Sequence, residues 1–176
     1  MKSAIPVKDA WKYCPCCGAE TKNVGQQPFA CCACGYRHYF SPSAAVGALI
    51  RDVQERMLFI VRGKDPGKGK LGLPGGFVDA GETAEQAVIR EIREELNLYV
   101  TDFRYLASFP NKYEFAGVTL PVTDLFFVSA VQSLDDIVTQ EGEIEGFRFL
   151  PAADVDASML AFATHQQALA AFLAGQ

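Results

Sequence analysis

Three glutamates near the end of one predicted helix have the types and spacing of a cation site. At 100° per residue, Glu91, Glu94 and Glu95 fall within roughly one third of the helix circumference. Like charges at these spacings cost about 0.2–0.5 kcal/mol per pair, and carboxylates in the last turns oppose the helix dipole. Arg90, four residues before Glu94, is expected to relieve one of these charges. Oxygen ligands on one face suit Mg²⁺ or Mn²⁺, although a solvated charged face explains the same pattern.

A second chemical signal comes from the cysteines, all six of which lie between residues 14 and 34. Two C-x-x-C pairs, each followed by a glycine, contain four of them: Cys14, Cys17, Cys31 and Cys34. Four thiolates in two such turns predict a closed tetrahedral Zn²⁺ site. The segment is too short to bury much apolar surface, so zinc would supply its folding energy. Cys16 and Cys32 are interpreted as spectators, and His38 as a packed ring rather than a ligand.

The helix that carries the glutamates has recognisable ends. Thr83 followed by Gln86 fits a capping box, which predicts a helix beginning at about Ala84. Asn97 can adopt a left-handed conformation and end the helix. An adjacent apolar face, which includes Ile92, is expected to dock on a sheet and leave the glutamates in a groove at the edge of the core.

The rest of the chain reads as strands and one further helix. Alternating and β-branched patterns predict strands at 44–52, 56–63 and 146–150, two or three strands over 98–132 with a turn near 116–117, and an amphipathic helix at 162–174. This predicts an α+β fold with a mixed sheet covered by helices. The expected domains are a zinc ribbon over residues 1–41 and a larger domain over residues 42–176.

The stretch GGFVDAGETAEQAVIREIREELNL resembles the signature of the Nudix hydrolases, G-x5-E-x7-R-E-U-x-E-E-x-G-U, where U is a bulky aliphatic residue. Eight of nine fixed positions match: Gly76, Glu82, Arg90, Glu91, Ile92, Glu94, Glu95 and Leu98. The departure is Asn97, where the family has glycine, and asparagine is the residue next best suited to a left-handed turn. The resemblance implies a Nudix-type α/β/α sandwich with a mixed sheet.

The same resemblance implies a reaction. Nudix hydrolases cleave the pyrophosphate of a nucleoside diphosphate linked to another group, which releases a nucleoside monophosphate. Carried onto this chain, Glu91 and Glu95 would be the main ligands of Mg²⁺ or Mn²⁺. The Gly76 carbonyl would be a third ligand, and Glu94 a further ligand or a group that positions water.

Supporting roles follow by the same route. Arg90 would hold the glutamates in place, and Glu82 would link the preceding loop to the helix. The general base lies on the helix in some members and on a later loop in others, so the candidates here are Glu94, Glu141 and Glu143.

Substrate contacts are also expected from residues around the signature. Arg62 could meet a phosphate, whereas Phe77 and Tyr113 could contact the nucleotide. Lys64 and its neighbouring lysines are expected on a mobile, solvated loop.

A zinc ribbon before a Nudix domain resembles the NADH pyrophosphatases. The comparable region, ASFPNKYEFAG, lacks the S-Q-P-W-type motif of that subgroup. NADH, FAD and ADP-ribose-like substrates therefore remain open. The alternative is a zinc-ribbon binding module attached to a non-catalytic Nudix-like nucleotide sensor. The ribbon is expected to act as a scaffold or dimer contact, which allows a homodimer.

Composition narrows the class of partner. The net charge of −5 argues against non-specific binding to nucleic acid. No apolar run approaches the roughly 20 residues of a membrane helix, and the first residues have no apolar signal-peptide region. We therefore expect a cytoplasmic protein that does not bind membranes and acts on a small nucleotide.

Overall fold

The structure is a computed structural model that describes residues 3–131 and 137–175. It contains two compact units. The first comprises the residues up to Ser43 together with Asn111–Val122. The second comprises Ala44–Pro110 and the residues from Thr123 onward. That residues 1–41 form a separate domain stays a prediction.

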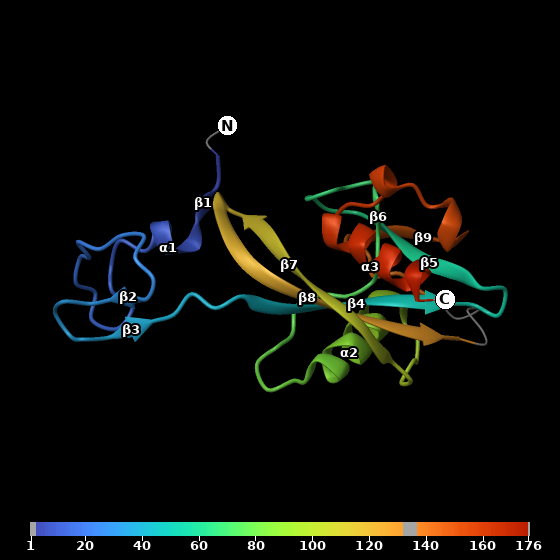
Figure 1. Ribbon diagram of the computed structural model, residues 1–176, viewed down its shortest axis with the longest axis horizontal. Coiled ribbons are helices and arrows are strands. Elements are labelled where there is room, and N and C mark those ends of the chain that lie inside the picture. The colour runs from blue at the N-terminus through green and yellow to red at the C-terminus, as the bar shows by residue number, and fades with distance from the viewer. Residues whose placement is uncertain (1–2, 132–136, 176) are drawn as a thin grey trace. The chain divides into compact units, whose positions relative to one another are not determined.

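The first unit is built from short elements (Figure 1). They are β1 (Ile5–Pro6), α1 (Val7–Ala10), β2 (Phe29–Ala30) and β3 (Arg37–His38). β2 and β3 form an antiparallel pair. Trp11 packs against Phe29 with ring centroids 5.5 Å apart and against Phe40 at 4.9 Å. This small aromatic cluster is what the unit buries around its cysteines.

A mixed seven-stranded sheet forms among the described residues. Its longer strands are β4 (Ser43–Arg51), β5 (Arg56–Arg62), β7 (Arg104–Phe115), β8 (Val118–Ala130) and β9 (Ile144–Pro151), and β6 (Leu71–Gly72) is short. The order is β1-β8-β4-β5-β6, with β7 on β8 and β9 on β5. β5 pairs antiparallel with β4, β6 and β9, whereas β1 pairs parallel with β8, which makes the sheet mixed. β7 and β8 run through both units.

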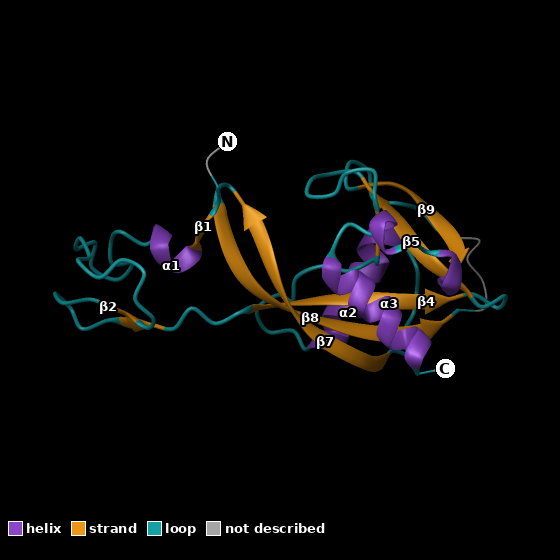
Figure 2. Ribbon diagram, turned by 45° about the horizontal axis from the view of Figure 1, so that its top comes forward, coloured by secondary structure: helices purple, strands orange, loops and turns teal. Residues whose placement is uncertain are grey.

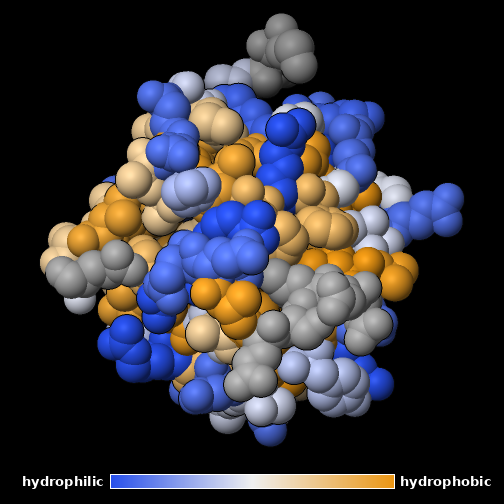
Figure 3. Space-filling model, turned by 90° about the vertical axis from the view of Figure 1, so that its right-hand side faces the viewer, coloured by the Kyte–Doolittle hydropathy of each residue, from blue (hydrophilic) through white to orange (hydrophobic). Residues whose placement is uncertain are grey.

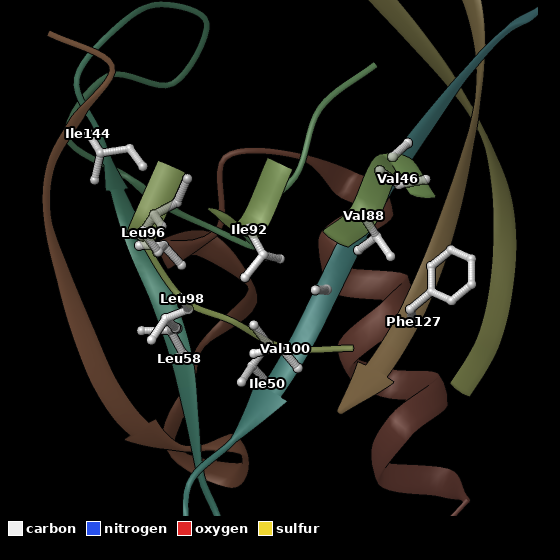
Figure 4. Close-up of a cluster of buried hydrophobic side chains, with 13 residues drawn as sticks. Val46, Ile50, Leu58, Val88, Ile92, Leu96, Leu98, Val100, Phe127 and Ile144 are labelled. Carbon is white, nitrogen blue, oxygen red and sulfur yellow. The ribbon is translucent and has the colours of Figure 1, made fainter. Parts of the chain in front are cut away.

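Two helices cover the sheet in the second unit (Figure 2). They are α2 (Ala84–Leu96) and α3 (Ala163–Ala174), and the short 3-10 turns Ala152–Asp154 and Ala157–Met159 precede α3. On β5, Leu58 and Ile60 pack in the cluster that contains α2, whereas Met57 and Phe59 pack in the cluster that contains α3. Successive strand residues point to opposite faces, so the helices lie on opposite faces of the sheet. The α2 cluster is drawn in Figure 4, where Val88, Ile92 and Leu96 meet residues of β4 and β5.

Most of the predicted elements are confirmed, as is the α/β/α arrangement. The long 98–132 stretch forms β7 and β8, joined at Ala116 and Gly117, whose φ angles are 49° and 79°. Sequence patterns missed β1, β2, β3 and β6, which have two residues each. Strands that short show no period, and the partner of β1 also lies far away in the sequence, on β8.

On the face shown in Figure 3, polar and apolar residues are interspersed. Such mixing is ordinary for the surface around a packed core. Over the described ranges, no helix has the length and apolar character needed to cross a membrane.

Candidate active site and zinc centre

The signature helix begins and ends where the sequence predicts. The Thr83 hydroxyl accepts a hydrogen bond from the Gln86 N–H, and the Gln86 side chain accepts one from the Thr83 N–H, at 3.3 and 2.8 Å. Asn97 follows the last turn in the left-handed region, with φ 54° and ψ 22°. Fixed ends and a buried apolar face hold α2 in one register against the sheet, and that register places the glutamates.

The three glutamates differ in burial. The Glu95 residue is 8% exposed and the Glu91 side chain 15% exposed, whereas the Glu94 side chain is 54% exposed. Burial, together with the charges of Glu91 and Glu143, raises the pKa of Glu95 to about 8 against the opposing effect of a backbone hydrogen bond. Burial is also the main cause that raises the pKa of Glu91. Both carboxyl groups have lost much of their water, which disfavours their charged forms.

A glycine pair before the helix approaches these carboxyl groups closely. The Gly75 N–H donates to Glu95 Oε2 at 2.8 Å. A Cβ on Gly76 would lie 2.5 Å from Glu91 Oε1, and one on Gly75 would lie 2.2 Å from the Val46 carbonyl oxygen. A side chain at Gly75 would therefore displace backbone, whereas one at Gly76 would push the Glu91 carboxyl group from its place. The Gly76 carbonyl accepts from the Val46 N–H at 2.8 Å, which ties the same loop to β4.

Arg90 contacts more of the cluster than the helical spacing predicted. Its Nε and Nη2 donate to the two oxygens of Glu82 at 2.6 and 3.0 Å. Its Nη1 donates to Glu91 Oε1 at 2.8 Å and to Glu94 Oε2 at 3.0 Å. The expectation that Arg90 relieves a single charge is thus wrong, because one guanidinium presents five donors. The contact with Glu82 also joins the loop before α2 to the helix.

The donor types around Glu95 fit a hard divalent cation: one buried carboxyl group, one partly buried carboxyl group and a backbone carbonyl, all oxygens. Their present arrangement is not a closed ligand set. Among the described residues, only the four cysteines bring three or more ligand atoms within 4.8 Å of one another. Arg90 accounts for the difference, because it engages Glu91 and Glu94 with one nitrogen.

The loop before β9 lies beside the end of α2. The Gln140 N–H donates to the Glu95 carbonyl at 3.0 Å. The charge of Glu143 acts on Glu95, and the Glu143 carboxylate pairs with Lys64 Nζ at 2.6 Å. Glu141 is exposed. Of the two candidates on this loop, Glu143 is therefore the one that the structure connects electrostatically to the signature helix.

The three predicted substrate contacts fall in different places. Arg62 donates from Nε to the Pro66 carbonyl at 2.8 Å, and its charge acts on Glu95. Phe77 is partly exposed, and its carbonyl accepts from Arg90 Nη2 at 3.0 Å. Tyr113 belongs to the first compact unit, so its place in the site stays a prediction.

Three contacts near the site were not anticipated. Lys64 was expected on a solvated loop but pairs with Glu143. The Gly75 N–H on Glu95 comes from a backbone group that carries no side-chain signal. His165 on α3 accepts a hydrogen bond from the Leu73 N–H at 3.1 Å. Nothing in the sequence pointed to this contact except that His165 is one of two histidines in the chain.

The four predicted zinc ligands converge. The Sγ atoms of Cys14 and Cys34 lie 3.8 Å apart. Those of Cys17 and Cys31 lie 3.7 Å apart. A tetrahedron with Zn–S bonds of about 2.3 Å has edges of about 3.8 Å, so the spacing fits this ion. Backbone N–H groups of Cys34 and Ala33 lower the pKa of Cys31 to about 6, whereas hydrogen bonds among the clustered thiols and burial raise the pKa of Cys17 and Cys34 against the opposing effect of backbone hydrogen bonds.

The two knuckles have matching backbones. Gly18 donates to the Cys14 carbonyl at 2.9 Å, and Gly35 donates to the Cys31 carbonyl at 3.0 Å. Their φ angles are 73° and 76°, which glycine adopts without steric cost. The spacing C-x-x-C-G thus produces the same turn twice.

The surplus cysteines and the histidine lie outside this four-thiol group. Cys16 and Cys32 are exposed. His38 stacks on Trp11 with ring centroids 4.6 Å apart, as a packed ring.

Comparison with known proteins addresses the family directly. The model of the NUDIX domain matches residues 41–172. This chain belongs to the Nudix family. The match covers α2 with its glutamates and all of β4 to β9.

Curated relatives of this Nudix chain share part of its length. The ADP-ribose pyrophosphatase of Methanocaldococcus jannaschii is 49% identical over 63 residues, which is 36% of this chain and 37% of that protein. The NAD-capped RNA hydrolase NudC of Stutzerimonas stutzeri is 30% identical over 139 residues, which is 78% of this chain and 47% of that protein. The chain spans less than half the length of these two relatives.

Solved Nudix structures share the fold. The NUDIX domain of Shewanella oneidensis NrtR, complexed with ADP ribose, superposes with a TM-score of 0.63 at 23% identity, over 77% of this chain and 88% of that one. The MutT NUDIX hydrolase of Burkholderia pseudomallei gives a TM-score of 0.63 at 26% identity, over 74% of this chain and 97% of that one.

Proposed function

We propose that this protein is a divalent-metal-dependent pyrophosphohydrolase that cleaves a nucleoside diphosphate linked to a second group. The observation that carries the proposal is the set of charged signature residues gathered around one buried carboxyl group. Glu95 lies against the Gly75 N–H, Glu91 abuts Gly76, and Arg90 joins the cluster to the loop. An inactive site would have no need to keep carboxyl groups buried beside each other.

In this proposal Glu91, Glu95 and the Gly76 carbonyl hold Mg²⁺ or Mn²⁺, and Glu94 is a further ligand. The cation, when bound, neutralises charge on the pyrophosphate and lowers the pKa of bound water. Arg90 stays bonded to Glu82, and so keeps the loop joined to the helix when cation binding changes the charge of the site.

Glu143 is the proposed general base, because it is close enough to Glu95 for its charge to act there. Its carboxylate accepts a proton as the water oxygen forms a bond to phosphorus and the anhydride P–O bond breaks. Lys64 holds that carboxylate at 2.6 Å in the absence of substrate. Glu141 and Glu94 are the alternatives that a kinetic comparison of variants would separate.

The proposed substrates contain an adenosine diphosphate joined to a further group. The activities for which the two relatives are named support this class, since they concern ADP-ribose and NAD-capped RNA. ADP-ribose, NADH and FAD are therefore the first compounds to test. Arg62 would contact a phosphate and Phe77 the nucleotide. One zinc ion per chain is proposed at the four cysteines, as a structural scaffold.

A substrate panel tests the proposal. The protein, Glu95→Gln and Glu85→Gln are incubated with each dinucleotide plus Mg²⁺ or Mn²⁺, and released nucleoside monophosphate is measured. Glu85 is an exposed glutamate at the start of the same helix, so its variant controls for lost charge. We expect turnover by the protein and Glu85→Gln, and loss of at least about 100-fold in Glu95→Gln. Binding without any cleavage would instead support the nucleotide-sensor alternative.

A further inference from the structure

The segment Leu73–Gly76, which connects β6 to the signature helix, is held by three different elements. From β4, the Ala48 N–H donates to the Pro74 carbonyl at 2.9 Å, and a second β4 residue binds the Gly76 carbonyl. From α2, the Glu95 carboxyl accepts the Gly75 N–H at 2.8 Å. Each bond fixes one residue of the segment. Among the hydrogen bonds that the described residues make to this segment, the one to the Leu73 N–H comes from α3, on the opposite face of the sheet.

That contact is the imidazole of His165. Its Nδ1 accepts the Leu73 N–H at 3.1 Å, so a neutral ring carries its hydrogen on Nε2. Phe126 and Phe162 meet the imidazole edge-on, with ring centroids 5.8 and 5.1 Å away. The aromatic rings fix the direction in which Nδ1 points.

The same turn of α3 also supports a candidate substrate residue. The guanidinium of Arg62 lies over the Phe162 ring at 4.8 Å. Burial, and then the charge of Arg62, lower the pKa of His165, which keeps the ring neutral and able to accept. The start of α3 therefore touches both the glycine segment and the predicted phosphate contact.

We propose that His165 is a positioning residue, which holds Leu73 so that Gly75 and Gly76 keep their places against Glu95 and Glu91. This rests on the proposed function only where metal binding is concerned, because the backbone contact exists independently of it. A histidine that merely fills the core would be replaceable by any apolar residue of similar size. A positioning histidine is replaceable only by a residue that keeps an acceptor at Nδ1.

Two substitutions separate these roles. The Oδ1 of His165→Asn can occupy the place of Nδ1, whereas His165→Leu fills space without an acceptor. Gln167→Leu adds an apolar side chain at an exposed position of the same helix and serves as the matched control. For each folded, zinc-loaded protein, two quantities are measured: Mn²⁺ affinity by calorimetry and the exchange rate of the Leu73 amide by NMR.

We expect His165→Leu to speed Leu73 exchange and to weaken Mn²⁺ binding, each by about tenfold, as when a group that supports metal ligands is lost. His165→Asn and Gln167→Leu should stay within about threefold of the parent protein. Equal behaviour of the Leu and Asn variants, in either direction, would overturn the proposal.

Two further outcomes are informative. If the parent protein binds no Mn²⁺, the proposed function fails, yet Leu73 exchange still decides the role of His165. If His165→Leu does not fold, the ¹⁵N shift of His165 Nδ1 in the parent decides: an unprotonated acceptor supports the proposal, and a protonated Nδ1 contradicts it.

Discussion

The affinity of the site for a divalent cation should depend steeply on pH, because its most buried ligand has to lose a proton first. The pKa of Glu95 is raised to about 8, chiefly by burial. Without metal, the folded protein therefore holds a proton on Glu95 that the unfolded chain releases above a pKa of about 4.3. Metal binding needs the carboxylate, so uptake displaces that proton.

The size of the effect follows from the fraction of ionised Glu95. With a pKa of about 8, roughly 1% is ionised at pH 6 and half at pH 8, so the apparent association constant for Mn²⁺ rises about 50-fold over this interval. The stability of the metal-free protein changes with pH in the opposite direction. The metal-free folded protein binds more protons than the unfolded chain between about pH 4.3 and 8, so its stability falls as pH rises through that window.

Calorimetric titration of zinc-loaded protein with Mn²⁺ tests this at several pH values. Repeating it at pH 7 in buffers of different ionisation enthalpy gives the protons released, for which we expect close to one per ion. Glu85→Gln should reproduce the slope and Glu95→Gln should abolish it. An association constant that is flat between pH 6 and 8, with no proton release, would refute the assignment of Glu95 as a buried ligand.

Three further predictions follow from the fold and the metal centres. Gly76→Ala should keep the fold but weaken Mn²⁺ binding by at least about tenfold, because its Cβ would lie 2.5 Å from Glu91 Oε1; calorimetry and circular dichroism measure the two effects. Removal of zinc by a chelator under reducing conditions should shift the fluorescence of Trp11, the single tryptophan, to the red, because its packing on Phe29 depends on the knuckles. Asn97→Gly should raise the free energy of unfolding by up to about 1 kcal/mol in urea titrations, because residue 97 has φ 54°.

Each of these has an outcome that contradicts it. Parent-like Mn²⁺ affinity in Gly76→Ala would show that Glu91 does not need the bare glycine. An unchanged spectrum after zinc has left would show that the aromatic cluster folds without metal. A less stable Asn97→Gly would mean that the asparagine side chain contributes more than its left-handed backbone costs.

Sequence patterns predicted the ends of α2 because caps are local: Thr83 and Gln86 lie three residues apart and bond directly. They also predicted the cysteine site, since C-x-x-C-G specifies its turn. Helical spacing alone predicted only the pair of Arg90 with Glu94, whereas the family resemblance implied that Arg90 holds the glutamates and that Glu82 links the loop to the helix. Arg90 binds Glu82 across a loop, eight residues away, and that contact depends on the path of the chain between them. His165 and Leu73 are 92 residues apart, and no local pattern encodes such a pair.

The two proposed metal sites should differ in whether folding requires the bound ion, and Arg90 is the reason for the difference. Its guanidinium already supplies a positive charge to the signature helix, so we expect the larger unit to fold without a bound cation. In the cysteine centre, four sulfur atoms lie within 4.8 Å of one another, an arrangement that zinc would hold together. We therefore expect zinc to stay bound as a permanent part of the fold. The second cation should bind reversibly, with an occupancy that follows its concentration in solution.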